Sequence, residues 1–447
     1  MIDSLNSFLF STPEMTRVFS PQAQLRAMLS FEWALTCALE KKGLAEPDSG
    51  DIVRAFLDAE FVDGESLERE ARDAGNIAIP LVRQLTAAVR GRSEAASRSI
   101  HLGATSQDVL DTALVLQIRD ARMLLEAAIE RLDNALGMQV REHAETLLTG
   151  RTWLQPGPPT TVGLKFAGTL AALRRARGRL QAAAQRALVL QFGGAVGTLA
   201  ALGGAEAGVS TEVARLLDLR EPEAPWHTQR DRFADVVQVL ALLTGSLAKF
   251  ARDVALLMQG EVGEVSEGGE RGGSSTMPHK HNPVGCAAVL AAHARMPGLA
   301  ATMLNAMVQE HERGLGLWQA EWETVPEAFR LSAAALAYSI EIAEGLKVDA
   351  ARMRVNFDAL LGVTLSEAVS AALASKIGRS AAHALLREAT RRALHQKRHL
   401  GDVLKEMPEV IEHLRCEEIE ALMDPRAYLG SAQRFITQVL EGPHADS

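Results

Sequence analysis

The chain has few of the features that mark disulfide-stabilised, zinc-binding or nucleic-acid-binding proteins. Its three cysteines, Cys37, Cys286 and Cys416, are odd in number, far apart and in no CxxC pair. We therefore expect neither a disulfide framework nor a zinc site, and a reducing cytoplasm fits. The net charge of −9 disfavours nucleic-acid binding, because phosphate groups need a basic surface.

Long uncharged apolar segments are also lacking. The N-terminus, MIDSLNSFLFSTPEM, has no basic region and no long apolar run, so we expect no signal peptide. The most apolar stretch, Val236 to Met258, is interrupted by Lys249, Arg252 and Asp253. This pattern predicts a buried helix rather than a membrane span. We expect a cytoplasmic protein with no membrane partner.

Aromatic residues make up only 4% of the chain, and strand-like alternation of apolar and polar residues is scarce. The chain is instead rich in Ala, Leu, Arg and Glu, which favour helix. Apolar residues recur at helical spacing in five long stretches, near 113–148, 160–188, 233–257, 283–309 and 325–346. Five such helices form a bundle. We predict an all-α fold with three helical domains, at 1–112, 113–355 and 356–447.

Two polar motifs stand at the starts of predicted long helices. In HLGATSQD (101–108), Thr105 or Ser106 can cap the following helix, and Asp108 complements its positive end. In RTWLQPGPPTTVG (151–163), the prolines stop one helix and pre-shape the next, which Thr160 or Thr161 can cap. Each motif, taken alone, is explained by a capped helix or a tight turn between helices.

A third motif, GGSSTMPHKHNP (272–283), follows a glycine-rich segment and carries more than a cap needs. Asn282 is a good N-cap and Pro283 a good first helical residue. Two serines, two histidines and Lys280 come immediately before this helix start. Because exposed N–H groups at a helix N-terminus bind anions and Lys280 adds a charge, the motif predicts an anion site.

This third motif resembles the signature GSSxMPxKxNP of the fumarase/aspartase superfamily, with every fixed position matched from Gly273 to Pro283. The order of the three motifs and the all-helical layout resemble that superfamily too. Within it, the segments 191–203, 225–232 and 309–327 resemble the bacterial 3-carboxymuconate cycloisomerase family. The adenylosuccinate lyase family is the nearest competitor, since it shares a similar HxGATSxD motif, a QRDR-like segment and a comparable loop.

The resemblance implies a reaction in which a substrate carboxylate adds across a conjugated double bond to form a lactone. Ser274 would carry the proton. Lys280 and Asn282 would help stabilise the charge that develops on a carboxylate next to the carbanion. The remaining residues implied to bind the small polycarboxylate substrate are His101, Thr105, Ser106, Trp153, Gln155, His227, Ser275 and Met277.

The second motif departs from the lyases of the superfamily. Those enzymes commonly have THxQ, whose histidine helps with acid catalysis, whereas this chain has Trp153 in TWLQ. The cycloisomerases also resemble TWLQ, often followed by a histidine, but Pro156 stands there in this chain. Neither branch therefore supplies a second acid–base residue from this motif.

The predicted helix 113–148 also bears on assembly. If unbroken, its 36 residues span about 54 Å, which separates Thr105 from Trp153 within one chain. Residues from different subunits can still meet. The resemblance implies a homotetramer whose active sites are each built from three chains.

Other kinds of site have little support in the sequence. HExxH, the phosphate-loop pattern GxxxxGK[ST] and a GxSxG elbow are all absent, and no carboxylate or cysteine ligand set accompanies the histidines. We expect an enzyme without metal or cofactor. The alternatives are a lyase of the same superfamily, notably adenylosuccinate lyase, and a non-catalytic helical scaffold.

Overall fold

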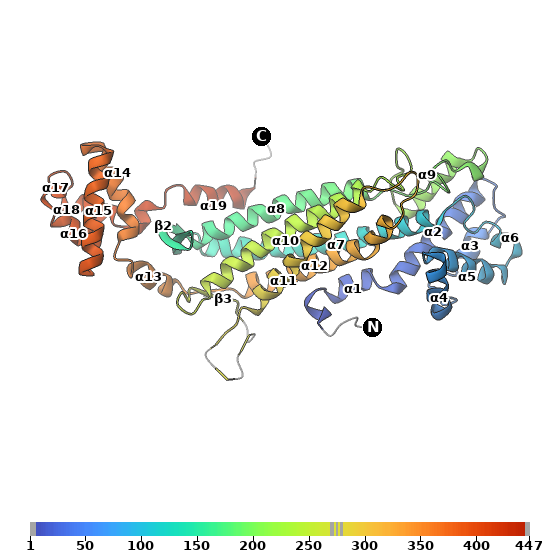
Figure 1. Cartoon of the computed structure of the whole chain (residues 1–447), viewed down its shortest axis with the longest axis horizontal. Coiled ribbons are helices and arrows are strands. Elements are labelled where there is room, and N and C mark those ends of the chain that lie inside the picture. Colours follow the sequence, from blue (N-terminus) through green and yellow to red (C-terminus); the bar gives the residue numbers. More distant parts are fainter. Residues whose placement is uncertain (1–5, 269–271, 274–275, 278–279, 443–447) are drawn as a thin grey trace. The chain divides into compact units, whose positions relative to one another are not determined.

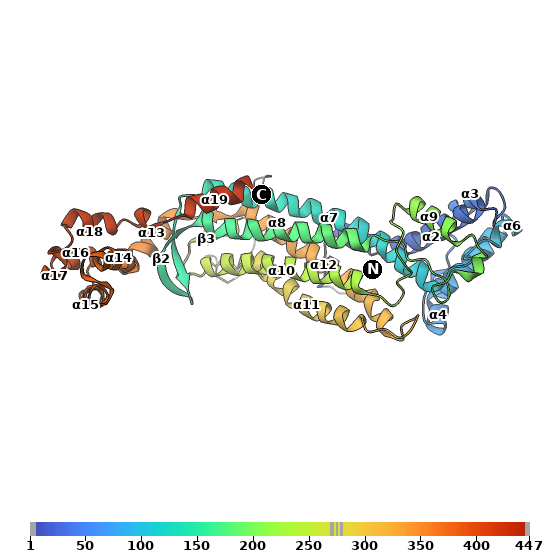
Figure 2. The same ribbon diagram turned by 90° about the horizontal axis from the view of Figure 1, so that it is seen from above.

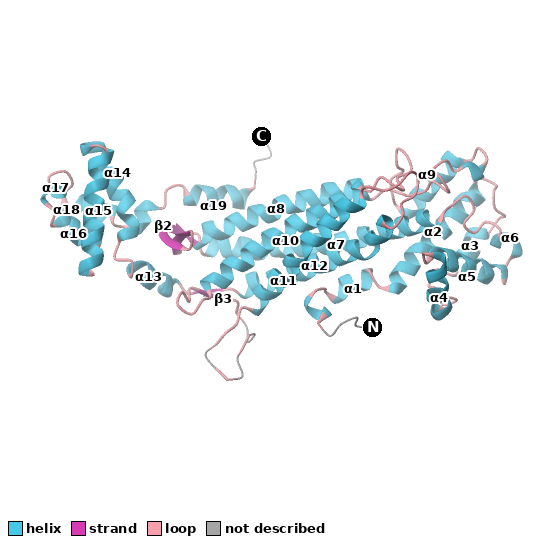
Figure 3. Ribbon diagram, viewed as in Figure 1, coloured by secondary structure: helices cyan, strands magenta, loops and turns pink. Residues whose placement is uncertain are grey.

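The structure is a computed structural model that describes residues 6–268, 272–273, 276–277 and 280–442. Helices dominate, and strands are few (Figure 3). The prediction of an all-α fold with long central helices is confirmed. The five longest helices are α7 (Ser106–Glu142), α8 (Val162–Ala187), α10 (Asp231–Leu257), α11 (Val284–Ala306) and α12 (Leu317–Gly345).

Apolar periodicity explains why the long helices pack. The predicted stripe of α7 is buried throughout, at Leu114, Ile118, Leu125, Ile129, Leu132 and Leu136. The stripe of α10 is equally buried, at Phe233, Val236, Leu240, Leu243, Leu247, Phe250, Val254 and Leu257. Burying each such side chain contributes about 1.5–3 kcal/mol, so these stripes supply a large part of the driving force for packing.

Two of these helices differ in extent from the prediction. Helix α7 spans 106–142 rather than 113–148, because Thr105 begins it and the chain after Glu142 enters a strand. Helix α12 begins at Leu317 rather than near Val325, with Pro326 inside it. The additional turns are held by Trp318, which is buried and whose indole N–H donates to Asp111.

The segment predicted to be a turn between helices is largely a β-hairpin. Strand β1 (Leu147–Thr152) pairs antiparallel with β2 (Gln155–Thr161). Trp153 and Leu154 form the two-residue turn, and both have positive φ, 53° and 63°. A two-residue turn with this backbone matches the twist of the flanking strands, although glycine or asparagine usually occupies it.

The hairpin leads directly into α8 (Figure 2). The Thr161 hydroxyl accepts a hydrogen bond from the Leu164 backbone N–H at 3.1 Å, so the predicted cap of this helix is confirmed at Thr161. A second short antiparallel pair joins β3 (Val265–Ser266) to β4 (Lys347–Val348).

The chain divides into two compact units. Unit 1 comprises 1–129, 175–245 and 291–337, and unit 2 comprises 130–174, 246–290 and 338–447. Each of the five long helices contributes a segment to both units. The boundaries predicted after residues 112 and 355 are not unit boundaries, and they stay a prediction.

Unit 1 adds a set of shorter helices to its share of the long ones. Helix α2 packs against α3 and α9, and Lys41 of α2 pairs with Glu212 of α9 at 2.7 Å (Figure 1). The shorter elements are η1 (Ser7–Leu9), α1 (Pro13–Val18), α2 (Pro21–Lys41), α3 (Ser49–Arg54), α4 (Gly64–Ala74), α5 (Ala78–Arg90), α6 (Glu94–Ser97), η2 (Ala200–Leu202) and α9 (Glu206–Leu217).

Unit 2 ends in a small helical cluster with its own apolar core. Val369 and Leu373 of α14 and Leu386 of α15 lie in that core together with Leu404 and Ile419. The elements of unit 2 from residue 350 onward are α13 (Ala350–Asp358), η3 (Val363–Leu365), α14 (Ser366–Ile377), α15 (Arg379–Gln396), α16 (Leu400–Lys405), α17 (Pro408–Ile411), α18 (Cys416–Leu422), η4 (Pro425–Tyr428) and α19 (Ala432–Glu441). The core residues come from α14 to α18 and the segments between them.

Among the residues that the structure describes, two single helices have the length and apolar composition that a membrane span needs, namely α10 and α11. In their most apolar windows, 61% of α10 and 39% of α11 is buried by the rest of the protein. In α10 the buried part is the stripe described above. Phe250 in that stripe makes an edge contact with Phe166 of α8, with ring centroids 5.9 Å apart. The apolar residues of α10 thus serve packing between helices.

Candidate functional site

The first motif forms the turn that starts α7, as the sequence predicts. Thr105 takes the cap position, since its carbonyl accepts from the Asp108 backbone N–H at 3.0 Å. The Asp108 carboxylate in turn accepts a hydrogen bond from the Thr105 backbone N–H at 3.0 Å. Ser106 is the first helical residue, and it is half-buried like Thr105.

Asp108 also ties this turn to a glycine turn distant in sequence. Its fully buried carboxylate accepts from the backbone N–H groups of Gly193 at 3.0 Å and Gly194 at 2.9 Å. Nε2 of His227 lies 2.7 Å from the same carboxylate, and His227 is only 4% exposed. The structure thus places His227 beside the first motif, as a partner of Asp108.

One turn further along α7, a buried ion network links this helix to two of the segments that carried the family resemblance, 225–232 and 309–327. Arg230 is fully buried between Asp111 at 2.7 Å and Glu321 at 2.5 Å. Trp318 donates its indole N–H to Asp111 at 3.0 Å. Burial opposes the charge on Arg230, but the two carboxylates outweigh it and raise the pKa of the guanidinium. Since every charge is paired, this network fixes the segments rigidly.

Arg313 is a residue of this region that the sequence argument missed. It follows α11 in an irregular segment, so no periodicity points to it, although it lies within the family-like segment 309–327. Its Nη1 donates to the Thr105 hydroxyl at 2.7 Å and its Nε to Gln107 at 2.8 Å. Burial lowers its pKa, while Asp108 and Asp111 act against that shift. A guanidinium therefore stands at the hydroxyl expected to bind a substrate carboxylate.

His101 lies at the start of the same turn, with φ 59°. Its ring is 23% exposed and contacts Glu32 of α2. Unit 1 thus brings together four of the predicted residues, His101, Thr105, Ser106 and His227, and adds Arg313 to them.

Unit 2 holds the described part of the signature loop. The backbone N–H and the side-chain amide of Asn282 both donate to the Gly272 carbonyl at 2.9 Å, so the ends of the loop are fastened together. Lys280 is exposed, and its N–H donates to the Met277 carbonyl at 2.9 Å. Met277 is 42% exposed. Ser274 and Ser275 lie outside the described residues.

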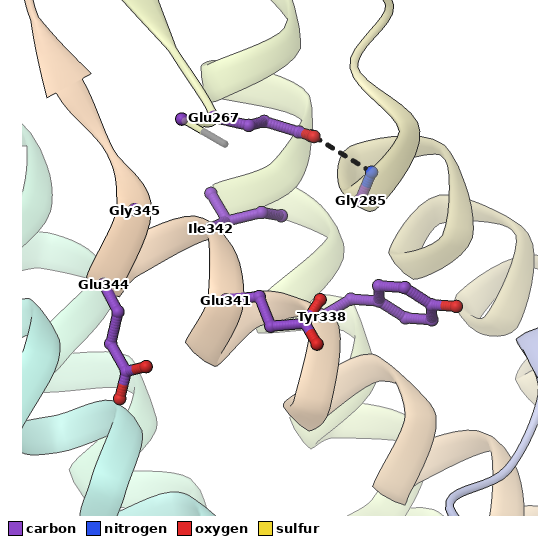
Figure 4. A pocket seen from close by; sticks show the side chains of 8 residues that line it. Glu267, Gly285, Tyr338, Glu341, Ile342, Glu344 and Gly345 are labelled. Atoms are coloured by element: carbon purple, nitrogen blue, oxygen red, sulfur yellow. Dashed lines mark hydrogen bonds between the residues drawn. The ribbon is translucent and has the colours of Figure 1, made fainter. Parts of the chain in front are cut away.

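The cap of α11 differs from the prediction. The helix begins at Val284, and Pro283 takes the cap position, because its carbonyl accepts from the Ala287 N–H. The Glu267 carboxylate accepts from the N–H group of Gly285 at 3.0 Å (Figure 4) and from that of Cys286 at 2.7 Å. Glu267 rather than Asn282 is the side-chain cap. A carboxylate complements the positive helix end better than an amide, and the Asn282 amide is occupied in closing the loop.

A cavity of about 340 Å³ lies next to this cap, as Figure 4 shows. Three glutamates line it, Glu267, Glu341 and Glu344, together with Tyr338 and Ile342. This acidic lining would repel a polycarboxylate, so the cavity is a poor candidate for the substrate pocket. Burial and Glu267 together raise the pKa of the neighbouring Cys286 thiol, which keeps it protonated.

The hairpin of unit 2 carries Trp153 and Gln155, and both side chains are exposed. Trp153, at the tip, is 98% exposed, and the adjacent Leu154 is 73% exposed. The hairpin is anchored close to its tip, because Arg151 binds the buried Glu264 at 2.7 Å. A rigid hairpin thus presents an uncovered aromatic ring.

The predicted residues are therefore divided between the two units. Thr105 and its neighbours belong to unit 1, whereas Trp153, Gln155 and the signature loop belong to unit 2. Helix α7 runs unbroken for 37 residues, about 55 Å, between Thr105 and the chain that enters the hairpin. Within the described parts of the chain, no group of three His, Cys, Asp or Glu side chains is arranged to hold a metal ion. That the enzyme works without a metal ion stays a prediction.

Comparison with known proteins assigns the family. A family model described as "Lyase" matches residues 8–298, and one described as "Adenylosuccinate lyase C-terminus" matches residues 362–439. The chain is 50% identical over 438 residues to 3-carboxy-cis,cis-muconate cycloisomerase of Pseudomonas aeruginosa, covering 98% of this chain and 95% of that protein. It is 39% identical over 434 residues to nitrosuccinate lyase of Streptomyces davaonensis, covering 95% and 91%.

Solved structures agree with this assignment. The crystal structure of 3-carboxy-cis,cis-muconate lactonizing enzyme from Pseudomonas putida superposes with a TM-score of 0.93 at 48% identity, covering 98% of both chains. The chain belongs to the lyase family of the fumarase/aspartase superfamily, the family that includes the bacterial 3-carboxy-cis,cis-muconate cycloisomerases.

Proposed function

We propose that this protein interconverts 3-carboxy-cis,cis-muconate and a carboxymuconolactone, a step in aromatic catabolism. The proposal rests on near full-length similarity to cycloisomerases at up to 50% identity. The family also includes lyases that act on other substrates, so membership alone leaves the reaction open. The observation that carries the choice is Trp153 at the hairpin tip, which takes the place of the histidine in the THxQ motif that lyases of the superfamily commonly have.

The leaving group explains why a tryptophan suits this position. When the lactone opens, the leaving group is a carboxylate. It leaves as an anion at neutral pH because its conjugate acid has a pKa of about 4. A leaving amine or purine nitrogen benefits from a general acid, and a carboxylate does not. An enzyme for lactone chemistry therefore has room for an apolar ring at this place, and a flat ring also suits a planar, conjugated substrate.

Ser274 is the proposed proton carrier. In the lactone-forming direction, one substrate carboxylate oxygen bonds to an alkene carbon while the neighbouring carbon takes the proton of the Ser274 hydroxyl. The serine then regains a proton from solvent. In the reverse direction, Ser274 removes that carbon-bound proton. Lys280, which is exposed and belongs to the same signature motif as the serines, would favour the serine alkoxide and stabilise the charge that develops on the carboxylate next to the carbanion.

Binding of the other carboxylates is assigned to the first motif. Thr105 and Ser106 provide hydroxyl groups, and Arg313 provides a cation 2.7 Å from the Thr105 oxygen. Gln155 would donate a further hydrogen bond, with Ser275 and Met277 lining the signature loop. Asn282 would act mainly by holding the loop closed, since its amide is bonded to Gly272.

We further propose a cytoplasmic homotetramer whose active sites combine residues of several chains. The 37-residue helix between Thr105 and the hairpin supports this, and so does a tryptophan that is 98% exposed on a rigid hairpin. Mixing two inactive variants, Ser274→Ala and Thr105→Val, after partial unfolding should restore activity, because some hybrid sites contain neither defect. No recovery in hybrids verified to be mixed would count against shared sites.

A direct assay distinguishes cycloisomerase activity from adenylosuccinate lyase activity. The purified chain is incubated with 3-carboxy-cis,cis-muconate while the diene absorbance is followed, with adenylosuccinate as the parallel substrate. We expect loss of the diene and no useful cleavage of adenylosuccinate. Cleavage of adenylosuccinate without action on carboxymuconate would favour the competing lyase reading, which the match of residues 362–439 to the adenylosuccinate lyase C-terminus keeps open.

A further inference from the structure

Glu32 and His101 form a closely bonded pair between α2 and the first motif. The Glu32 side chain is 1% exposed. One of its oxygens lies 2.6 Å from Nδ1 of His101, and the other accepts from the His101 backbone N–H at 2.9 Å. His101 has φ 59°, a left-handed conformation that residues with a side chain rarely adopt. One buried carboxylate thus holds both the backbone and the ring of this histidine.

The charge of Glu32 needs a counter-charge, because a buried carboxylate without one is costly. Among the residues that the structure describes, the Glu32 carboxylate has no hydrogen-bond partner other than His101. Burial by itself would lower the pKa of His101. The charge of Glu32 and its hydrogen bond outweigh burial, with Asp108 adding to them, and the pKa is raised above its ordinary value.

The pair belongs to the same electrostatic neighbourhood as the carboxylate-binding residues. The charged groups that act on the His101 ring are Glu32 from α2 and Asp108 from α7. Asp108 also acts on Arg313, whose guanidinium is bonded to Thr105. Because Nδ1 is bonded to Glu32, the second ring nitrogen of a protonated His101 remains as a donor on a ring that is 23% exposed.

We propose that Glu32 is a positioning residue that keeps His101 protonated, so that the imidazolium joins Arg313 and Thr105 in binding a substrate carboxylate. This rests on the proposed function. It assigns a role to a residue of α2, which no sequence motif includes, and it makes His101 a cationic binding residue rather than a proton carrier. Substrate affinity should then fall as pH rises through the folded-state pKa of His101.

The test compares Glu32→Gln with Glu32→Asp and with Glu40→Gln. Glutamine keeps the volume but removes the charge, and aspartate keeps the charge. Glu40 is a matched control, since it lies on the same helix and accepts backbone N–H groups of Asp48 and Gly50 at 2.9 and 3.0 Å. The measurements are the pH profile of kcat/KM for carboxymuconate and the pH titration of the His101 ring by NMR, assigned with His101→Gln.

An opposite charge at hydrogen-bond distance shifts a pKa by about 1–3 units. We expect Glu32→Gln to move the alkaline limb of kcat/KM and the His101 titration to lower pH by that amount, mainly through KM. Glu32→Asp should lie close to wild type, and Glu40→Gln should not move the limb. If the His101 titration is the same in Glu32→Gln and wild type, the proposal is wrong, and this readout stands even if carboxymuconate is not the substrate.

Stability gives a second readout that does not depend on activity. His101 has a folded-state pKa above its unfolded value of about 6.5. The Glu32–His101 pair therefore makes its full contribution to the free energy of unfolding at pH values below the unfolded-state pKa of His101. This contribution is lost as pH rises through the folded-state pKa. The stability advantage of wild type over His101→Gln should shrink across that window. An advantage that is independent of pH would overturn the proposal, and this comparison remains available if Glu32→Gln does not fold.

Discussion

Asp108 in unit 1 and Glu267 in unit 2 both place a buried or half-buried carboxylate at the start of a long helix, but with different consequences. Asp108 bonds to the turn that precedes α7 and to the distant Gly193–Gly194 turn, and it leaves Arg313 bonded to Thr105. Glu267 takes the first N–H groups of α11 itself. The same residue chemistry thus joins two distant turns in one unit and occupies a helix end in the other.

This difference indicates in which unit the groups expected to bind an anion are already in place. In unit 1, Arg230 is paired with Asp111 and Glu321, and Arg313, the cation expected to meet a carboxylate, is bonded to Thr105. In unit 2, Lys280 is exposed, and the N–H groups that were expected to bind an anion are taken by Glu267. An anion that uses the α11 terminus must therefore first displace Glu267.

The largest expected effect is on the chemistry of the loop. Ser274→Ala should lower kcat by about 10²–10⁴-fold, the usual contribution of a positioned proton carrier, while helical content and oligomeric state are retained. Steady-state kinetics and circular dichroism measure the two quantities. Ser375→Ala, an exposed serine of α14, serves as the control. A Ser274→Ala variant within about threefold of wild type would exclude Ser274 as the proton carrier, since the expected loss is far larger.

The buried ion network of Arg230, Asp111 and Glu321 should instead affect the stability of the fold. Arg230→Met leaves Asp111 and Glu321 buried without their cation, which typically costs about 3–5 kcal/mol. Denaturant unfolding measures the loss. The matched control is Arg232→Met, two residues away, whose partner Glu223 is largely exposed and whose ion pair should contribute about 0–1 kcal/mol. If the two variants lost the same free energy of unfolding, the buried network would contribute no more to stability than an exposed ion pair.

The hairpin tip should give a smaller effect on catalysis. Trp153→His removes a flat ring whose contact with a conjugated substrate is worth about 0.5–1.5 kcal/mol, so kcat/KM for carboxymuconate should fall about two- to tenfold. The variant should not become an efficient adenylosuccinate lyase, because the rest of that pocket is unchanged. Leu154→Ala, at the other turn position, separates packing of the tip from contact with substrate.

An effect of similar size, but on stability, is expected at the cap of α11. Glu267→Ala removes the acceptor for Gly285 and Cys286 and should cost about 0.5–2 kcal/mol of stability. Glu261→Ala, an exposed glutamate nearby, is the control. If Glu267 competes with anions for the helix end, inhibition by inorganic sulfate should also become stronger in Glu267→Ala. Unchanged stability and unchanged sulfate inhibition would contradict both roles.

The sequence by itself determined the helical class and the positions of the five long helices. Apolar side chains at helical spacing have one way to be buried, and the stripe from Leu114 to Leu136 is buried as predicted. It also identified the capping residues of α7 and α8, because capping at Thr105 and Thr161 depends on neighbours only a few residues away, although the apolar stripe placed the first turn of α7 too late. The motif that identified the family is equally local, since it is read from eleven consecutive residues.

Tertiary structure alone decided which distant residues meet. Glu32 lies 69 positions from His101, and Arg313 lies 208 positions from Thr105, and no spacing rule connects such pairs. The α11 cap went to Glu267 rather than Asn282 because the short β3–β4 pairing ends beside the helix and a carboxylate outcompetes an amide there. Local periodicity fixes which face of a helix is buried, whereas the charge partners on that face depend on how the chain returns to it.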